Sequence, residues 1–231
     1  GNPPPPEAFK EGWPIVTANV LPDDLTGKKW GIVTNWRECG REWERTAQVA
    51  YYENGSNVFS STAGIRLHGG RSREPWNPRK SFRLYFRDSY GSDRFKPGVL
   101  FGPESEPLRH LIVHSDWPEE SYFAHGLALD AARQIGCVTP SFRHVIFYLN
   151  GELQGIYFLS EQVNREHWVS RMGHRNFLMH VFRSKSVEKE AGDAIEKLVD
   201  RLQRDSGSLD LGWVEKNFDL DSLSRYIFLI V

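Results

Sequence analysis

The chain has 231 residues, of which 26% are charged and 39% are hydrophobic, and its formal net charge is -1. This composition is typical of a globular protein with one large domain or two small ones, and the balanced charge excludes an overall nucleic-acid-binding signature. No apolar run approaches the roughly 20 residues that a transmembrane helix needs. The four consecutive prolines near the start predict a proline-rich linker at residues 1–12.

The first part of the chain alternates between apolar and polar residues in the manner of β-strands. Short strands are predicted at 13–20 and 29–34. A longer pair at 46–52 and 58–68 is joined by Asn54-Gly55, a dipeptide that favours a two-residue hairpin turn because both positions tolerate positive φ. The sequence therefore predicts an antiparallel sheet in this part of the chain.

The middle of the chain adds further strands and one helix. Strands are predicted at 81–87 and 108–114, and the apolar spacing of 121–135 predicts a helix that ends at Gly136. A second hairpin is predicted around Asn150-Gly151.

Beyond Glu161 the pattern changes to helix, with helices predicted at 164–171, at 193–204 and from 219 to the end, and one strand near 177–181. Because strands come early and helices late, the sequence predicts an α+β fold, a twisted and mainly antiparallel sheet with a packed helix, followed by a helical region. We place the sheet-rich region at 13–182 and the start of the helical region at 183–231. The apolar run 225–231 would rarely be left exposed at a natural C-terminus, so we expect the fold to be C-terminally truncated, with the sequence stopping inside a larger domain.

The segment 64–85 carries the strongest local charge. The segment has six positive side chains and one negative side chain, Glu74, so its formal net charge is +5 in an otherwise balanced chain. Glycines allow backbone N–H groups to approach an anion, and guanidinium and ammonium groups bind phosphate. The segment therefore predicts either a phosphate site or a solvated ribbon whose charges face water. The six cations are Arg66, Arg71, Arg73, Arg79, Lys80 and Arg83.

Other polar residues give weaker signals. The sequence has no HExxH or Cys/His metal spacing, no GxxxxGK[ST] phosphate loop and no GxSxG nucleophile motif. Asp219 precedes an apolar-periodic run and is interpreted as a helix N-cap. Glu161 follows a predicted strand, where a carboxylate either orients a lysine or holds a cation, or simply favours a helix start. Cys39 and Cys137 either pair or stay as thiols.

Three blocks of sequence agree in order and spacing with one known family. Residues Gly64 to Arg73, followed by Pro78 to Leu84, are similar to a signature of the form GxxxRGxSSRxxPKKSF. Residues 111–116 are similar to a strand that ends in Asp before a helix, and residues 147–161 to a hairpin of the form YxNGEYxGxYxLxE. Together they resemble the CotH kinase family, the spore-coat-protein-H-like proteins.

The resemblance implies an atypical protein-kinase-like fold that uses ATP with Mg²⁺ or Mn²⁺. It implies that Lys80 contacts the nucleotide phosphates, that Glu161 is its ion-pair partner, and that Arg66, Arg71 and Arg73 line the phosphate side. It further implies a secreted, cell-surface or spore-coat protein that phosphorylates Ser or Thr of a coat or extracellular protein.

The sequence also departs from the family pattern. His68 stands where Arg is common, and Arg79 takes the place of the first lysine of the signature. The family carries its catalytic Asp, the following Asn and a metal motif downstream of the helix that begins at Asp219. We therefore expect no catalytic or metal-binding residue before Val231 and no activity of this chain alone. The alternatives are a non-catalytic structural or interaction module of a coat or surface assembly, and an anion- or glycan-binding domain that uses its tryptophans.

Overall fold

The computed structural model describes most of the first 164 residues and short parts of the remainder. The described residues are 3–91, 94–96, 98–103, 105–115, 122–164, 196–197, 199–201, 203–204, 211–217, 219–222 and 224–225. The chain divides into two compact units, one formed by Gly1–Leu129 and Pro140–Gln162 and the other by Asp130–Thr139 and Val163–Val231.

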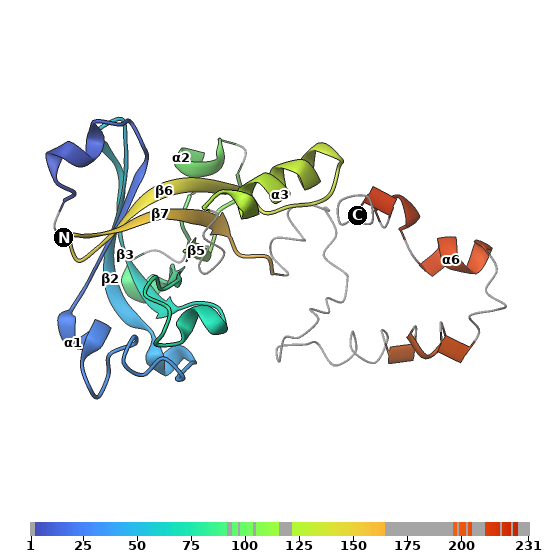
Figure 1. Ribbon diagram of the computed structural model, residues 1–231, viewed down its shortest axis with the longest axis horizontal. Helices are drawn as coiled ribbons and strands as arrows, with labels where there is room; N and C mark the ends of the chain where they lie inside the picture. Colours follow the sequence, from blue (N-terminus) through green and yellow to red (C-terminus); the bar gives the residue numbers. More distant parts are fainter. Residues whose placement is uncertain are drawn as a thin grey trace. The chain divides into compact units, whose positions relative to one another are not determined.

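The first unit is built on one sheet that closes on itself (Figure 1). Its strand order is β1-β2-β3-β4-β5-β7-β6, and β6 returns to pair with β1. The β1–β6 pairing is parallel and the other pairings between these strands are antiparallel. The predicted α+β class with a mainly antiparallel sheet is confirmed. The strands are β1 (Ile15–Val20), β2 (Arg45–Glu53), β3 (Ser56–Leu67), β4 (Phe82–Tyr85), β5 (His110–His114), β6 (Phe142–Leu149) and β7 (Glu152–Glu161).

The helices among the described residues are short. The 3-10 turns are η1 (Pro6–Phe9), η2 (Arg41–Trp43), η3 (Arg71–Arg73) and η4 (Asp88–Tyr90). The α-helices include α1 (Pro22–Thr26), α2 (Gly98–Phe101), α3 (Ala124–Gln134) and α6 (Leu211–Asn217), and the described residues within 196–204 and 220–225 are also helical.

The inside of the closed sheet is the hydrophobic core. Side chains alternate between the two faces of each strand, so one apolar residue in two points inward. Ile65 in β3, Leu84 in β4, Val113 in β5, Phe147 in β6 and Leu159 in β7 are at most 1% exposed. The outward-facing residues of the same strands are therefore the ones available for a site.

Both predicted hairpins are confirmed. Asn54 and Gly55 have φ of 50° and 78°, and Asn150 and Gly151 have φ of 53° and 85°. Asparagine and glycine are the residues that adopt positive φ most readily, which is why these dipeptides turn the chain so tightly. The first turn joins β2 to β3 and the second joins β6 to β7.

The predicted strand at 29–34 is wrong. The chain there continues from α1 in tight turns, in which Gly31 N donates to Gly27 O (2.9 Å) and Ile32 N donates to Asp24 O (3.0 Å). A Cβ atom at Gly31 would lie 2.4 Å from Gly27 N, so this close backbone approach requires glycine. The close backbone contact between Gly27 and Gly31 therefore places residues 29–34 in turns, although their sequence alternates like a strand.

The remaining predicted elements have mixed outcomes. The helix predicted at 121–135 is confirmed as α3, and Gly136 follows it with φ of 83°. The helix and strand predicted near 164–171 and 177–181 lie outside the described residues, apart from residue 164 itself. Cys39 and Cys137 are free thiols.

The N-terminal segment packs on the first unit. Pro4 is buried, and the Phe9 ring lies 5.7 Å from the Tyr52 ring of β2. The assignment of residues 1–12 as a linker stays a prediction.

Candidate functional site

The loop between β3 and β4, residues 68–81, is held by its own hydrogen bonds. His68 N donates to Ser81 O (2.8 Å), which closes the loop at its base. Ser72 Oγ donates to His68 O (2.9 Å). Asn77, which is fully buried, donates from Nδ2 to Ser72 O (3.0 Å) and accepts from Arg79 N at Oδ1 (2.9 Å). The loop therefore presents its charged side chains from a fixed backbone.

Lys80 lies against the backbone of this loop. Its Nζ donates to the carbonyl oxygens of Arg73 (3.3 Å) and Glu74, and its own carbonyl accepts from Tyr157 Oη (3.1 Å). Partial burial lowers the pKa of the Lys80 ammonium from its usual value. Two of the three ammonium donors are thus used by neutral carbonyl groups rather than by a carboxylate.

Arg71 and Arg73 project from η3 in different ways. Arg71 is exposed, and its guanidinium lies 5.9 Å from the Trp76 ring centroid. Arg73 donates from Nη2 to the backbone oxygen of Glu38. Arg73 therefore ties the loop to the segment before β2, whereas the weak ring contact is the one interaction of the Arg71 side chain with described residues.

Arg79 and Arg83 are partly buried. The Arg79 guanidinium donates to Ile156 O and lies 4.7 Å from the Tyr122 ring centroid. Arg83 Nη2 lies 3.0 Å from His68 Nδ1. Because the guanidinium is always protonated, it is the donor and His68 Nδ1 the acceptor.

These five side chains share one property: each lacks a carboxylate partner among the described residues. In the described part of the chain, none of them forms an ion pair. The one acid within the segment, Glu74, accepts from Trp76 Nε1 at its Oε2 (2.6 Å). We call this group the cation segment: Arg71, Arg73, Arg79, Lys80 and Arg83.

Arg66 behaves differently, because it belongs to a cluster around Glu44. Arg87 binds both carboxylate oxygens of Glu44 (2.8 and 2.9 Å), and Tyr90 Oη donates to Oε1 (3.1 Å). Arg66 Nε lies 3.9 Å from Oε2, and the Glu44 side chain is only 3% exposed. We call these four residues the Glu44 cluster. The local charge count missed it because Glu44 lies 20 residues before the predicted segment.

Two histidines beside these cations are kept neutral. Burial, reinforced by Arg83, lowers the pKa of His68 to about 3 and that of His110 to about 4. Both are uncharged near pH 7, so they add no positive charge to the site. Neutral His68 is what allows its Nδ1 to accept from Arg83.

Glu161 lies at the end of β7, where it is 6% exposed and opposite Leu111 of β5. Its Oε2 accepts from Ser141 N (2.7 Å). Between these described residues, the structure has no ion pair joining Glu161 to Lys80. The structure therefore brings Lys80 together with Arg73 but does not join it to Glu161, and that ion pair stays a prediction.

Among the described residues, no group of three or more His, Cys, Asp or Glu side chains is arranged to hold a metal ion. No helix in the described ranges is long and apolar enough to cross a membrane.

The site lies in a region with a clear relationship to known proteins. Residues 65–231 match the CotH kinase protein family. The chain belongs to this family. A search of curated proteins finds no match. Membership of the CotH kinase family implies use of a nucleotide and a substrate. The cation segment lies inside the matched residues, whereas Glu44 lies before them.

Proposed function

We propose that this chain carries the nucleotide-binding region of an ATP-dependent protein kinase of the CotH type, and that the cation segment holds the ATP phosphates. The observation that carries the proposal is the set of five cations without a carboxylate partner in the described structure. An ATP triphosphate supplies the negative charge that the neutral backbone acceptors of these side chains do not provide.

Holding the positive side chains of the cation segment close together is electrostatically unfavourable. Positive groups held together by a rigid loop repel one another, and partial burial adds a desolvation cost, which is the cause of the lowered pKa of Lys80. An anion bound there lowers the repulsion and offsets the desolvation cost with direct attraction. Because the loop backbone is fixed by Asn77, little reorganisation is needed when the anion binds.

Lys80 and the arginines have separate roles in this proposal. Lys80 acts as a compact charge with one ammonium donor still available beside the two that bind carbonyl oxygens. Arg71 and Arg73 offer planar, two-pronged donors suited to phosphate oxygens. Glu44 offsets part of the Arg66 charge. In this proposal Arg66 therefore attracts the phosphates at long range and does not bind them directly.

The divalent metal implied by the resemblance does not fit the described residues, which offer no set of carboxylates for it. We therefore assign it no ligands in this chain. We further propose that the phosphoryl acceptor is a Ser or Thr hydroxyl of a coat or extracellular protein, and that the protein is secreted or attached to a cell or spore surface. These points rest on the resemblance alone.

The test is the melting temperature of the chain with and without millimolar ATP and MgCl₂ or MnCl₂. A ligand at about 100 times its dissociation constant stabilises the folded state by about 2.7 kcal/mol, which raises the melting temperature by several degrees. The Lys80→Ala variant is expected to lose at least about tenfold in affinity, because it removes a charged donor to phosphate. Lys28→Ala is the matched control, since Lys28 is an exposed lysine outside the site.

One result would exclude nucleotide binding by this chain, and another would exclude the cation segment as the phosphate site. If neither ATP nor ADP changes the melting temperature, nucleotide binding is not a property of this chain. If Lys80→Ala binds ATP as well as the parent chain and Lys28→Ala do, the phosphates lie elsewhere.

A further inference from the structure

The outer face of β1, β2 and the first part of β3 carries a row of neutral polar side chains, away from Arg66 at the far end of β3. Asn19 of β1 lies opposite Gln48 of β2, and Gln48 lies opposite Thr62 of β3. Asn150 extends this row on the far side of β1, because its N donates to Ala18 O (2.8 Å). Neutral hydrogen-bonding side chains continue on both sides of the row. They are Thr46, Tyr52, Asn57 and Ser60.

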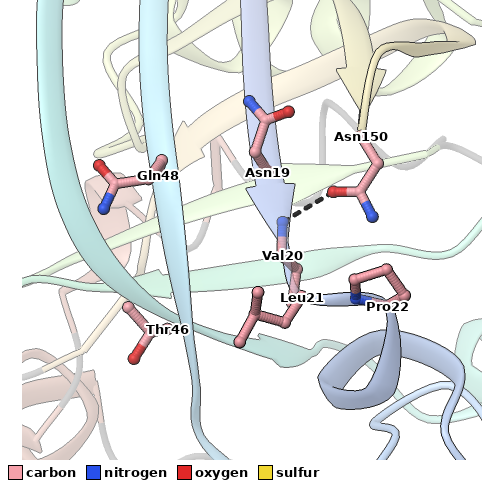
Figure 2. Close-up of a pocket in the computed structure, with 7 residues that line it drawn as sticks. All are labelled: Asn19, Val20, Leu21, Pro22, Thr46, Gln48 and Asn150. Carbon is pink, nitrogen blue, oxygen red and sulfur yellow. Dashed lines mark hydrogen bonds between the residues drawn. The ribbon is translucent and has the colours of Figure 1, made fainter. Parts of the chain in front are cut away.

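This face is hollowed at two adjoining places. A pocket of about 530 Å³ lies where β1 ends and α1 begins (Figure 2). A second hollow of about 200 Å³ shares Asn19 and Gln48 with it and extends toward Tyr52 and Ser60. The larger pocket lies within the usual size range of small-ligand sites. Its lining residues are Asn19, Val20, Leu21, Pro22, Thr46, Gln48 and Asn150.

The carboxamide groups in the pocket are positioned in advance. Asn150 Oδ1 accepts from Val20 N (2.7 Å), which fixes the amide and leaves its Nδ2 without a hydrogen bond in the described structure (Figure 2). Gln48 Nε2 lies 3.0 Å from Thr62 Oγ1 across the neighbouring strand. Such fixed donors and acceptors reduce the entropy cost of binding a polar ligand.

The chemistry of the lining selects a class of ligand. It contains no ionisable side chain, so it offers no positive charge to a phosphate or a carboxylate, in contrast to the cation segment. Carboxamides and hydroxyls both donate and accept hydrogen bonds, as sugar hydroxyls do. Leu21, which is 69% exposed, and Pro22 supply an apolar surface for the C–H face of a sugar ring.

The closed sheet argues against a peptide that binds as an added strand. Strand addition needs an edge with unpaired backbone groups. Here β1 pairs with β2 and β6, and β2 pairs with β1 and β3, so neither strand presents an edge. Recognition at this face must therefore use side chains.

We propose that the two adjoining hollows on the outer face of β1–β3 bind a neutral oligosaccharide, with successive sugar units in the larger pocket and the smaller hollow. This site is separate from the proposed nucleotide site. It would attach the domain to a glycan-bearing surface or substrate.

The test is isothermal titration of the whole chain with neutral oligosaccharides, namely maltohexaose, cellohexaose and chitohexaose. At least one is expected to bind with a submillimolar dissociation constant. The double variant Asn19→Ala, Gln48→Ala is expected to weaken that binding at least about tenfold, because several sugar hydrogen bonds are lost together. Gln154→Ala is the matched control, since it removes a carboxamide from β7, outside the pocket.

Three outcomes would overturn the proposal. One is the absence of binding by all three sugars at millimolar concentration. Another is binding that the double variant leaves unchanged while its melting temperature matches that of the parent chain. The last is a double variant that loses ATP instead, which would make this pocket the site of the nucleotide base. Unchanged sugar binding by Lys80→Ala would support two separate sites.

Discussion

Arg66 and Arg83 occupy equivalent places and have different surroundings. They lie directly opposite each other on the neighbouring strands β3 and β4. Arg66 belongs to the Glu44 cluster, in which a nearly buried carboxylate lies close to two guanidinium groups. Arg83 belongs to the cation segment, and its guanidinium donates to neutral His68. Within the part of the chain that the structure describes, one arginine therefore has a countercharge and the other does not.

This contrast separates charges that stabilise the fold from charges that bind a ligand. A buried carboxylate that is hydrogen-bonded on both oxygens stabilises the structure that positions it, and its removal leaves its partners uncompensated. Cations without a carboxylate add repulsion to the ligand-free protein, and this repulsion is relieved by an anion from solution. The Glu44 cluster should therefore control stability, and the cation segment should control nucleotide affinity.

The largest expected effect is on stability, in Glu44→Gln. We expect it to lower the free energy of unfolding by roughly 2–4 kcal/mol, because Arg87 and Arg66 lose their shared anion; the range allows for the partial exposure of Arg87. Urea unfolding measures the change. Glu53→Gln is the control, since the Glu53 side chain is 27% exposed against 3% for Glu44, and it should cost about 1 kcal/mol. An equal loss of unfolding free energy in the two variants would mean that Glu44 stabilises the fold no more than a partly exposed carboxylate does.

The next effect is a dependence of stability on pH through His68 and His110. Their folded pKa values, about 3 and about 4, lie below the usual 6.5, so the unfolded chain binds protons first as the pH falls. The stability they contribute is complete above pH 6.5 and is lost toward pH 4. Between pH 7 and pH 5 we expect a loss of about 1–2 kcal/mol per histidine.

Urea unfolding at both pH values, with the parent chain and His68→Gln, measures this dependence. The variant should lose less stability than the parent between pH 7 and pH 5, because one of the two titrating groups is gone. An identical loss in the two proteins would mean that His68 is not held neutral in the folded state.

The smallest expected effect on stability is in the cation segment itself. Arg71→Ala should change the free energy of unfolding by less than about 0.5 kcal/mol, because Arg71 is exposed and touches only the Trp76 ring. It should weaken ATP binding about two- to fivefold, more strongly at low salt. Arg37→Ala is the matched control, as Arg37 is also an exposed arginine over a tryptophan ring. A similar weakening by both variants would indicate unspecific charge attraction.

The sequence predicted local features well because they depend on neighbouring residues. Asn54-Gly55 and Asn150-Gly151 turn the chain through their own backbone preferences, and the alternation of residues 81–87 predicted the strand β4. The strand predicted at 29–34 failed because the tight approach of Gly31 to Gly27 is invisible to alternation.

Features that join distant residues could not be predicted. The parallel pairing of β1 with β6 brings together residues about 130 positions apart, and no local pattern encodes it. The same closure brings Asn150 beside Asn19 and creates the neutral pocket. Glu44 was missed for the same reason. It lies outside the segment 64–85 in which the charges were counted, and it comes close to Arg66 only when the strands pair.

Hydrogen exchange of the backbone amides, with and without saturating ATP and Mg²⁺, tests the central claim most directly. The account predicts slower exchange for amides between Gly69 and Ser81 when ATP is present, no change with adenosine alone, and no change around Glu44. Protection by ATP confined to other parts of the chain, with residues 69–81 exchanging as in the ligand-free protein, would contradict the claim that the cation segment holds the nucleotide phosphates.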